Sequence, residues 1–196
     1  MAKAKSKAKP KAKPKAAPRL PGDPNASQAV AQMLRVDHAG EYGAVRIYEG
    51  QLAVLGKSKA APVIQHMLDQ EKQHLEKFEQ LVGERRARPT ALLPFWHLAG
   101  FALGAGTALL GEKAAMACTV AVEEVIDEHY AEQIADLTAH DEEPELRDTF
   151  EAFRQEELAH RQTGLDHGAE AAPGYAALTG AVKAGSRLAI WLSTRI

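Results

Sequence analysis

Two Glu-x-x-His motifs are the residues of this sequence best suited to chemistry. They are Glu71–His74 in DQEKQH and Glu157–His160 in QEELAH. Residues three apart lie on one face of a helix, so each motif can offer a carboxylate oxygen and an imidazole nitrogen to the same metal ion. One motif alone is a weak signal, because a chain this rich in glutamate and histidine contains about one such pair by chance.

A single glutamate precedes each motif and turns the two motifs into an internal repeat. Glu41 lies 30 residues before the first motif, and Glu123 lies 34 residues before the second. Tyr48 and Tyr130 follow these glutamates by seven residues, which is two helical turns, so each tyrosine shares its glutamate's face. The repeat matches the di-iron carboxylate bundle, in which two helices supply one glutamate each and two supply Glu-x-x-His.

The residue types suit a pair of divalent cations. Bridging carboxylates offset the repulsion between two neighbouring cations, and two neutral imidazoles complete the set while leaving positions for dioxygen. Four carboxylates buried without metal would be very unfavourable. The alternative is that these residues line solvated helix faces, but the flanks of Glu41 and Glu123 are small and apolar. We therefore predict a two-iron site, for which manganese is also chemically acceptable, formed by Glu41, Glu71, His74, Glu123, Glu157 and His160.

Several neighbouring residues have two interpretations each. Asp37 and His38 share the face of Glu41, and they either hydrogen-bond the ligands or pair locally. Tyr48 and Tyr130 are the candidate catalytic residues for moving protons or electrons, although a buried, hydrogen-bonded tyrosine is the commoner role. Glu124 points away from Glu123 and is expected outside the site. The remaining histidines without a partner set are expected at the surface; they are His66, His129, His140 and His167.

Helices must position these residues. Apolar residues recur with helical period and no alternating strand pattern competes with it, so the fold class is all-α, a bundle with an internal two-fold repeat. The single cysteine, Cys118, excludes an intramolecular disulfide and is expected to be a small core residue. The expected helices cover about 27–55, 60–83, 113–139, 141–167 and 174–196.

Residues 91–111 are apolar without forming an obvious spanning helix. They carry no formal charge, but Pro94 and several glycines interrupt them. We expect this segment and the terminal helix, 174–196, to lie on a membrane surface, which implies a lipid-like substrate. The alternative is a buried core helix and a homodimer contact. The side chains expected at the membrane are Phe95, Trp96, Ile190, Trp191 and Leu192, with Arg85, Arg86, Arg88, Lys183 and Arg187 near anionic headgroups.

The chain has a basic start and an acidic remainder. Residues 1–19 hold eight of the 24 basic residues and no acidic one, which leaves 16 basic against 26 acidic residues, about −10, in 20–196. Residues 1–22 are therefore expected to form a disordered basic tail rich in lysine, alanine and proline, ahead of one domain at 23–196. Such a tail can touch anionic lipid or nucleic acid through charge alone, without base specificity, and a solubilising role is an equal alternative.

Four stretches resemble the demethoxyubiquinone hydroxylases of ubiquinone biosynthesis: DHAGEYGAVRIYEGQ, DQEKQHLEKF, the segment 88–126 and EELAHRQTGLDHGAE. The resemblance covers about 27–196 and implies a ferritin-like di-iron monooxygenase, peripheral to the membrane. It implies a polyprenylated methoxy-methyl-benzoquinol as substrate, dioxygen as co-substrate, and electrons from NADH or the quinol. The six ligands that the resemblance implies fall on the residues predicted above.

Three function classes follow from these observations. The first is the hydroxylase, the second is a ferritin-like iron store, and the third is a basic-tailed adaptor that binds no metal. Other proteins of ubiquinone biosynthesis are expected partners of the first class. Its expected location is the cytoplasmic face of a bacterial cell membrane, since no convincing transit peptide is visible, with the matrix side of the mitochondrial inner membrane as the alternative.

Overall fold

The computed structural model describes residues 20–196, which form helices and no strand. This agrees with the all-α prediction. The predicted disordered tail, apart from its last three residues, lies outside the described part of the chain. The six α-helices and one 3₁₀ turn are α1 (Ala26–Leu55), α2 (Ala61–Glu84), α3 (Leu93–Leu109), α4 (Glu112–His140), α5 (Pro144–Asp166), η1 (Ala169–Ala171) and α6 (Tyr175–Arg195).

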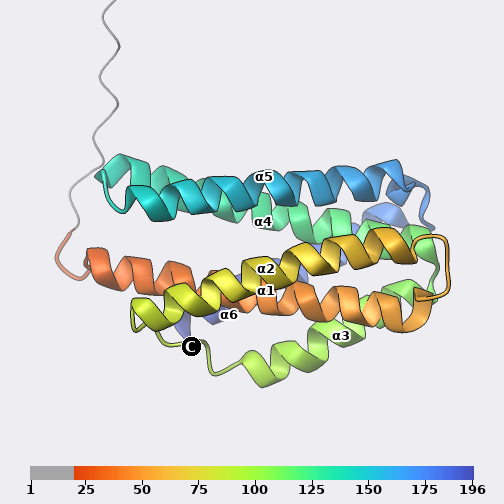
Figure 1. Ribbon diagram of the computed structural model, residues 1–196, viewed down its shortest axis with the longest axis horizontal. Coiled ribbons are helices and arrows are strands. Elements are labelled where there is room, and N and C mark those ends of the chain that lie inside the picture. Colours follow the sequence, from red (N-terminus) through yellow and green to blue (C-terminus); the bar gives the residue numbers. More distant parts are fainter. Residues whose placement is uncertain (1–19) are drawn as a thin grey trace, which may run out of the picture.

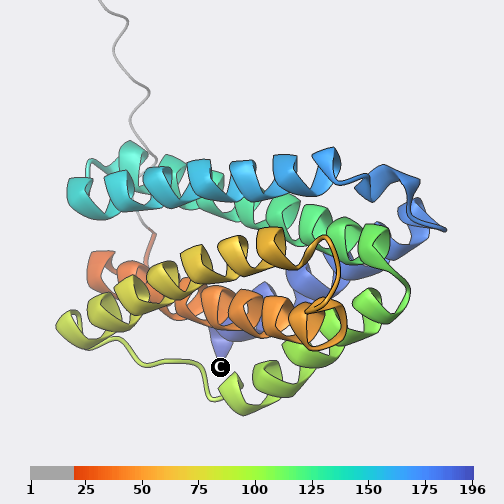
Figure 2. The ribbon, with the colours of Figure 1, turned by 45° about the vertical axis from the view of Figure 1, so that its right-hand side comes forward.

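Two antiparallel hairpins form a four-helix bundle. Helices α1 and α2 make the first hairpin and α4 and α5 the second, and the four helices run along the long axis of the molecule (Figure 1). Helix backbones approach closely within each hairpin and also between α1 and α3, whereas α1 and α4 approach each other closely at few points. Side chains therefore fill the space between the hairpins, which is where the predicted ligands point. One long connection through α3 joins the hairpins, as in ferritin-like bundles (Figure 2).

Local sequence signals set the helix ends. Asn25 caps α1 by accepting from the Gln28 backbone N–H, and the Gln28 side chain accepts from the Asn25 N–H in return. Proline lies in the first turn of α2, α3 and α5, where the missing N–H costs nothing. Asp141 ends α4 in the left-handed conformation, with φ of 54°.

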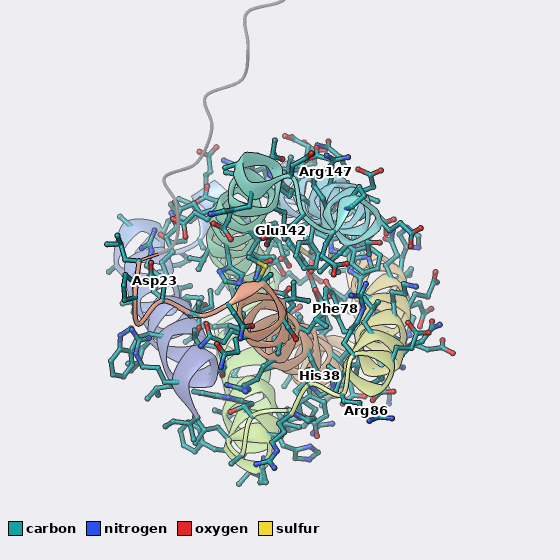
Figure 3. All side chains as sticks on the ribbon, turned by 90° about the vertical axis from the view of Figure 1, so that its left-hand side faces the viewer. Asp23, His38, Phe78, Arg86, Glu142 and Arg147 are labelled. Carbon is teal, nitrogen blue, oxygen red and sulfur yellow. The ribbon has the colours of Figure 1, made fainter. Side chains whose placement is uncertain are left out.

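Helices α3 and α6 flank α1 outside the four-helix core, as the end-on view shows (Figure 3). The expected interruption of 91–111 is wrong: Pro94 stands in the first turn of α3, and the glycines let this helix contact α1. A methyl group on Gly104 would overlap the Ile47 carbonyl oxygen, and one on Gly100 would lie 2.9 Å from the Gly43 carbonyl oxygen. The missing side chains therefore allow two helix backbones to touch.

The core surrounds the space between the hairpins. Phe78 of α2 points into this space (Figure 3) and stacks on Phe150 of α5, with ring centroids 6.1 Å apart. Cys118 is fully buried, as predicted, and burial raises the pKa of its thiol to about 12. Within residues 20–196, no helix combines the length and apolar character that crossing a bilayer requires.

Candidate metal centre

Six buried side chains from four helices meet between the hairpins. Each is at most 4% exposed. Their donor atoms form two groups, within each of which all atoms lie within 4.8 Å of one another. Both groups contain Glu71 and Glu157, so these two carboxylates could serve both ions of a pair. The first group is completed by Glu41 and His74, and the second by Glu123 and His160.

Contacts at the centre run both within a hairpin and from one hairpin to the other. The Nδ1 atom of His74 lies 3.0 Å from an oxygen of Glu157 and 3.5 Å from one of Glu41. The Nδ1 atom of His160 lies 3.1 Å from an oxygen of Glu71. Each imidazole therefore faces the Glu-x-x-His carboxylate of the opposite hairpin. The two halves of the predicted sequence repeat thus contribute side chains to one shared cluster.

Several of these buried atoms have no hydrogen-bond partner. They are both carboxylate oxygens of Glu71, one oxygen of Glu157 and Nδ1 of His74. Unsatisfied buried polar atoms are rare and costly in folded proteins. Here they all point toward the same small region, and they are the hard oxygen and borderline nitrogen donors that iron accepts. The donor set therefore fits two metal ions.

Without metal, the pKa values at the centre are displaced in opposite directions: those of Glu71, Glu123 and His74 are raised and that of Glu157 is lowered. Burial and the neighbouring carboxylates raise the pKa of Glu71 and of Glu123 well above the ordinary range. Burial lowers the pKa of His74, but the adjoining Glu157 and Glu41 outweigh it and raise this pKa to about 12. Burial raises the pKa of Glu157, whereas the two imidazoles outweigh it and bring this pKa to about 2. Protons thus replace part of the positive charge that metal ions would supply.

The two candidate tyrosines also act across the hairpins. Tyr48 of α1 donates a hydrogen bond to Oε1 of Glu123 (2.8 Å), and Tyr130 of α4 donates one to Oε1 of Glu41 (2.5 Å). Burial raises the pKa of both phenols well above 10. Each tyrosine therefore holds a ligand of the opposite hairpin, on the face on which the sequence placed it.

Asp37 and His38 fit neither of the two interpretations offered by the sequence. Asp37 bonds not to a ligand but to α4, where His129 Nε2 (3.1 Å) and Gln133 Nε2 (2.8 Å) donate to its Oδ1. His38 is buried, and its Nδ1 has no hydrogen-bond partner in the structure. Glu124 lies outside the centre, as predicted, and binds Arg161 and Lys183.

The four histidines expected at the surface do not behave alike. His66 and His167 are exposed, as predicted, and His140 is partly exposed. The prediction is wrong for His129, whose side chain is 17% exposed and paired with the buried Asp37. Its partner stands on a different helix, 92 residues away, so periodicity on its own helix could not reveal the pair.

An apolar cavity of about 400 Å³ lies beside the two helices that carry Glu41 and Glu123. It lies between α1, α3, α4 and α6, and it reaches Gly40 and Val122, the residues directly before the ligands Glu41 and Glu123. Gly43 lines it as well, with open space where a side chain would begin. At the other end, Trp96 donates a hydrogen bond to Ser193 and ties α3 to α6. The cavity therefore runs from two ligand-bearing helices to the outer pair of helices.

This arrangement has a match among known families. Residues 28–193 match the family model of the ubiquinone biosynthesis protein COQ7. The chain belongs to the COQ7 family. It is similar to the 3-demethoxyubiquinol 3-hydroxylase of Rhodospirillum rubrum, with 60% identity over 91% of this chain and 84% of the relative. It is also similar to the human NADPH-dependent 3-demethoxyubiquinone 3-hydroxylase, mitochondrial, with 58% identity over 86% of this chain and 78% of the relative. The yeast 5-demethoxyubiquinone hydroxylase, mitochondrial, is 40% identical over 90% and 84%.

Two polar contacts of this COQ7-family centre escaped the sequence prediction. Glu156 Oε2 lies 3.0 Å from Nε2 of His74, and Gln70 Oε1 lies 3.1 Å from Nε2 of His160. Each of these residues directly precedes the glutamate of a Glu-x-x-His motif. Their equivalent positions in the repeat were the one feature of the sequence that could have pointed to them. The contacts themselves depend on how the two hairpins are rotated against each other, which the sequence pattern does not give.

Proposed function

We propose that this chain is a di-iron, dioxygen-dependent monooxygenase that hydroxylates a polyprenylated methoxy-methyl-benzoquinol. The reaction is the 3-demethoxyubiquinol hydroxylation of ubiquinone biosynthesis. Family membership and the names of the relatives support this assignment. The observation that carries it is the joining of two features: a buried cluster suited to two metal ions, and an apolar cavity that begins beside it.

The proposed roles of the chain's own residues follow from their positions. The six clustered side chains hold two iron ions, which when bound supply the redox chemistry that activates dioxygen. The apolar cavity takes the quinol ring and the start of its prenyl tail, with Ala44 and Ile126 one helical turn from Glu41 and Glu123. Burial of the centre keeps bulk water away from the reacting ring. Electrons come from a reduced nicotinamide nucleotide, as the human relative's name states for that protein, or from the quinol itself.

We further propose that the outer end of the cavity rests on a membrane surface. Exposed apolar side chains gather on α3 and α6 there, including Phe95, Leu98, Leu188 and Trp191. A long prenyl tail would leave the cavity at this end and remain in lipid. Lys183 and Arg187 pair with Glu124 and Glu128 of α4, so Arg86 and Arg88, both exposed, are the better candidates for anionic headgroups.

Residues 23–196 then constitute the catalytic domain, and the positive charge of residues 1–22 suits the same anionic surface. The membrane is the cytoplasmic face of a bacterial cell membrane or the matrix side of the mitochondrial inner membrane. The human and yeast relatives carry the word mitochondrial in their names, and the Rhodospirillum relative is bacterial. A homodimer through the apolar face, or contacts with other proteins of ubiquinone biosynthesis, would cover part of this surface.

Two measurements test the assignment. Iron counted per chain after expression with iron should be about two; many ions would indicate a store, and none would exclude the centre. Deletion of the gene should cause a demethoxy quinone to accumulate. A plasmid carrying Glu123→Ala should fail to restore ubiquinone, whereas Glu124→Ala, which removes the adjoining glutamate outside the centre, should restore it. Normal ubiquinone in the deletion strain would refute the function, provided that no second hydroxylase is encoded.

A further inference from the structure

The outward nitrogen atoms of the two histidines at the centre have different partners. His74 Nε2 donates to a carboxylate oxygen, Oε2 of Glu156 (3.0 Å), and His160 Nε2 donates to an amide oxygen, Oε1 of Gln70 (3.1 Å). Both contacts cross between hairpins, and the two partners occupy equivalent positions of the repeat. The two groups of candidate ligands are therefore equivalent, but the partners behind their histidines are not: one is a carboxylate and the other an amide.

The two partners also bind each other. Gln70 Nε2 donates to Oε2 of Glu156 (3.3 Å), which leaves Gln70 Oε1 free to accept from His160. A continuous chain of hydrogen bonds thus joins the two imidazoles on the side away from the centre. Because each Nε2 carries a hydrogen that it donates outward, Nδ1 is the atom of each ring that faces the centre, and it becomes a metal donor once a metal ion displaces the proton there. This series of hydrogen bonds keeps a hydrogen on Nε2 of each imidazole, which is the tautomer that leaves Nδ1 for a metal ion.

The ligand atoms facing the centre do not themselves distinguish the two metal positions. Each group combines the shared carboxylates of Glu71 and Glu157 with one further glutamate and one histidine. An imidazole that donates to a carboxylate is a stronger electron donor than one that donates to a neutral amide. The side chain of Glu156 is 44% exposed, so water moderates its influence without removing it.

We propose that Gln70 and Glu156 are positioning residues that make the two iron positions unequal, the iron bound by His74 being the easier to oxidise. This inference rests on the proposed two-iron centre. It assigns the difference between the ions to one carboxylate–amide pair outside the ligand set. In a reaction that needs one electron from each iron, such a pair determines which ion loses its electron first.

The test uses the full chain loaded with iron-57 and three variants. Glu156→Gln gives both histidines an amide partner, and Gln70→Glu with Glu156→Gln exchanges the two partners. Glu151→Gln is the matched control, because Glu151 lies on the same helix with a side chain 47% exposed and loses the same charge. The readouts are the reduction potential of the centre and the Mössbauer spectrum, with iron content and melting temperature measured for every variant.

We expect two distinct quadrupole doublets in the wild type. Glu156→Gln should bring them closer together and raise the reduction potential, and the exchanged variant should restore both values toward the wild type. Glu151→Gln should leave both unchanged. A shift no larger than that of Glu151→Gln, or an exchanged variant that behaves like Glu156→Gln, would overturn the proposal. Neither readout needs a quinol, so a wild type that binds two irons but hydroxylates nothing would refute the function and leave this inference decidable.

Discussion

The two hairpins carry the same chemical residues in different surroundings. Helix α1 of the first hairpin and α4 of the second each present a glutamate and, seven residues later, a tyrosine that bonds to the other hairpin's glutamate. Between these shared residues the helices differ. Gly40 and Gly43 of α1 stand where α4 has Val122 and Val125. The shared residues maintain the centre, and the differing ones determine what lies beside it.

Gly43 of α1 leaves room that its repeat equivalent on α4, Val125, does not. Open space exists where a Gly43 side chain would begin, whereas Val125 is buried in the protein interior. The apolar cavity lies on this glycine-bearing side of α1. Asp37 adds a second difference, because its repeat equivalent is Thr119, which binds no histidine of the other hairpin. The duplicated set of candidate ligands therefore has an open apolar cavity on one side only of α1, where we propose that the substrate binds.

The largest expected effect separates shared from unshared ligands. Glu71→Gln and Glu157→Gln each remove a carboxylate that belongs to both groups, so we expect nearly complete loss of both irons and of activity. Glu41→Gln and Glu123→Gln each disturb one group, so about one iron per chain should remain. Iron content by mass spectrometry measures the difference. Equal iron loss in all four variants would contradict the distinction between the shared carboxylates, Glu71 and Glu157, and the unshared ones, Glu41 and Glu123.

The metal-free protein should lose stability as pH rises. Raised carboxyl pKa values of Glu71 and Glu123 mean that the folded state holds protons that the unfolded chain releases above about 4.5, so their contribution to stability falls above that pH. For His74, the contribution is complete below 6.5 and is lost as pH rises toward about 12. Both effects have the same sign from pH 5 to 9.

We expect the free energy of unfolding of the metal-free protein to fall steadily over this range, because the losses from the three groups add. Glu157 acts in the opposite direction, but only as pH falls toward about 2. Iron displaces the protons, so the stabilisation by iron should grow with pH. Urea unfolding of both forms at pH 5, 7 and 9 measures this. A metal-free protein that becomes more stable at pH 9 would contradict the assigned charges.

Giving α1 the valine of α4 should damage substrate use. Gly43→Val places a side chain in the cavity, where its Cβ meets no protein atom within 4 Å, so we expect kcat/KM for the quinol to fall about 10- to 100-fold with iron content unchanged. Gly106→Val is the control, because Gly106 also has open space at its Cβ position but lies exposed on α3 outside the cavity. A ring analogue with a smaller substituent should lose less. Equal losses for both substrates would point to a disturbed centre instead.

What the sequence could reveal depended on whether the signal was local. The convergence of the six candidate ligands was predictable because helical spacing and the repeat placed them without any knowledge of neighbouring helices. The continuous helix α3 was not, since Pro94 interrupts a helix or begins one depending on where the first turn starts. His129 and Glu156 were missed for a different reason: each meets a partner on another helix, and only the relative rotation of the hairpins brings them together.

The smallest expected effect distinguishes the two tyrosines and decides what they do. Tyr48→Phe and Tyr130→Phe each remove a donor to a ligand of the opposite hairpin, so each should weaken iron binding about 10-fold, measured by competition with a chelator. Tyr130→Phe should have the larger effect, because its bond is the shorter one and because Glu41 would then face the nearby negative charge of Asp37 with no donor between. A tyrosine that instead carries protons or electrons would show a lower kcat with unchanged iron affinity. That outcome in one variant alone would make the two hairpins chemically unequal at the tyrosines as well as at the cavity.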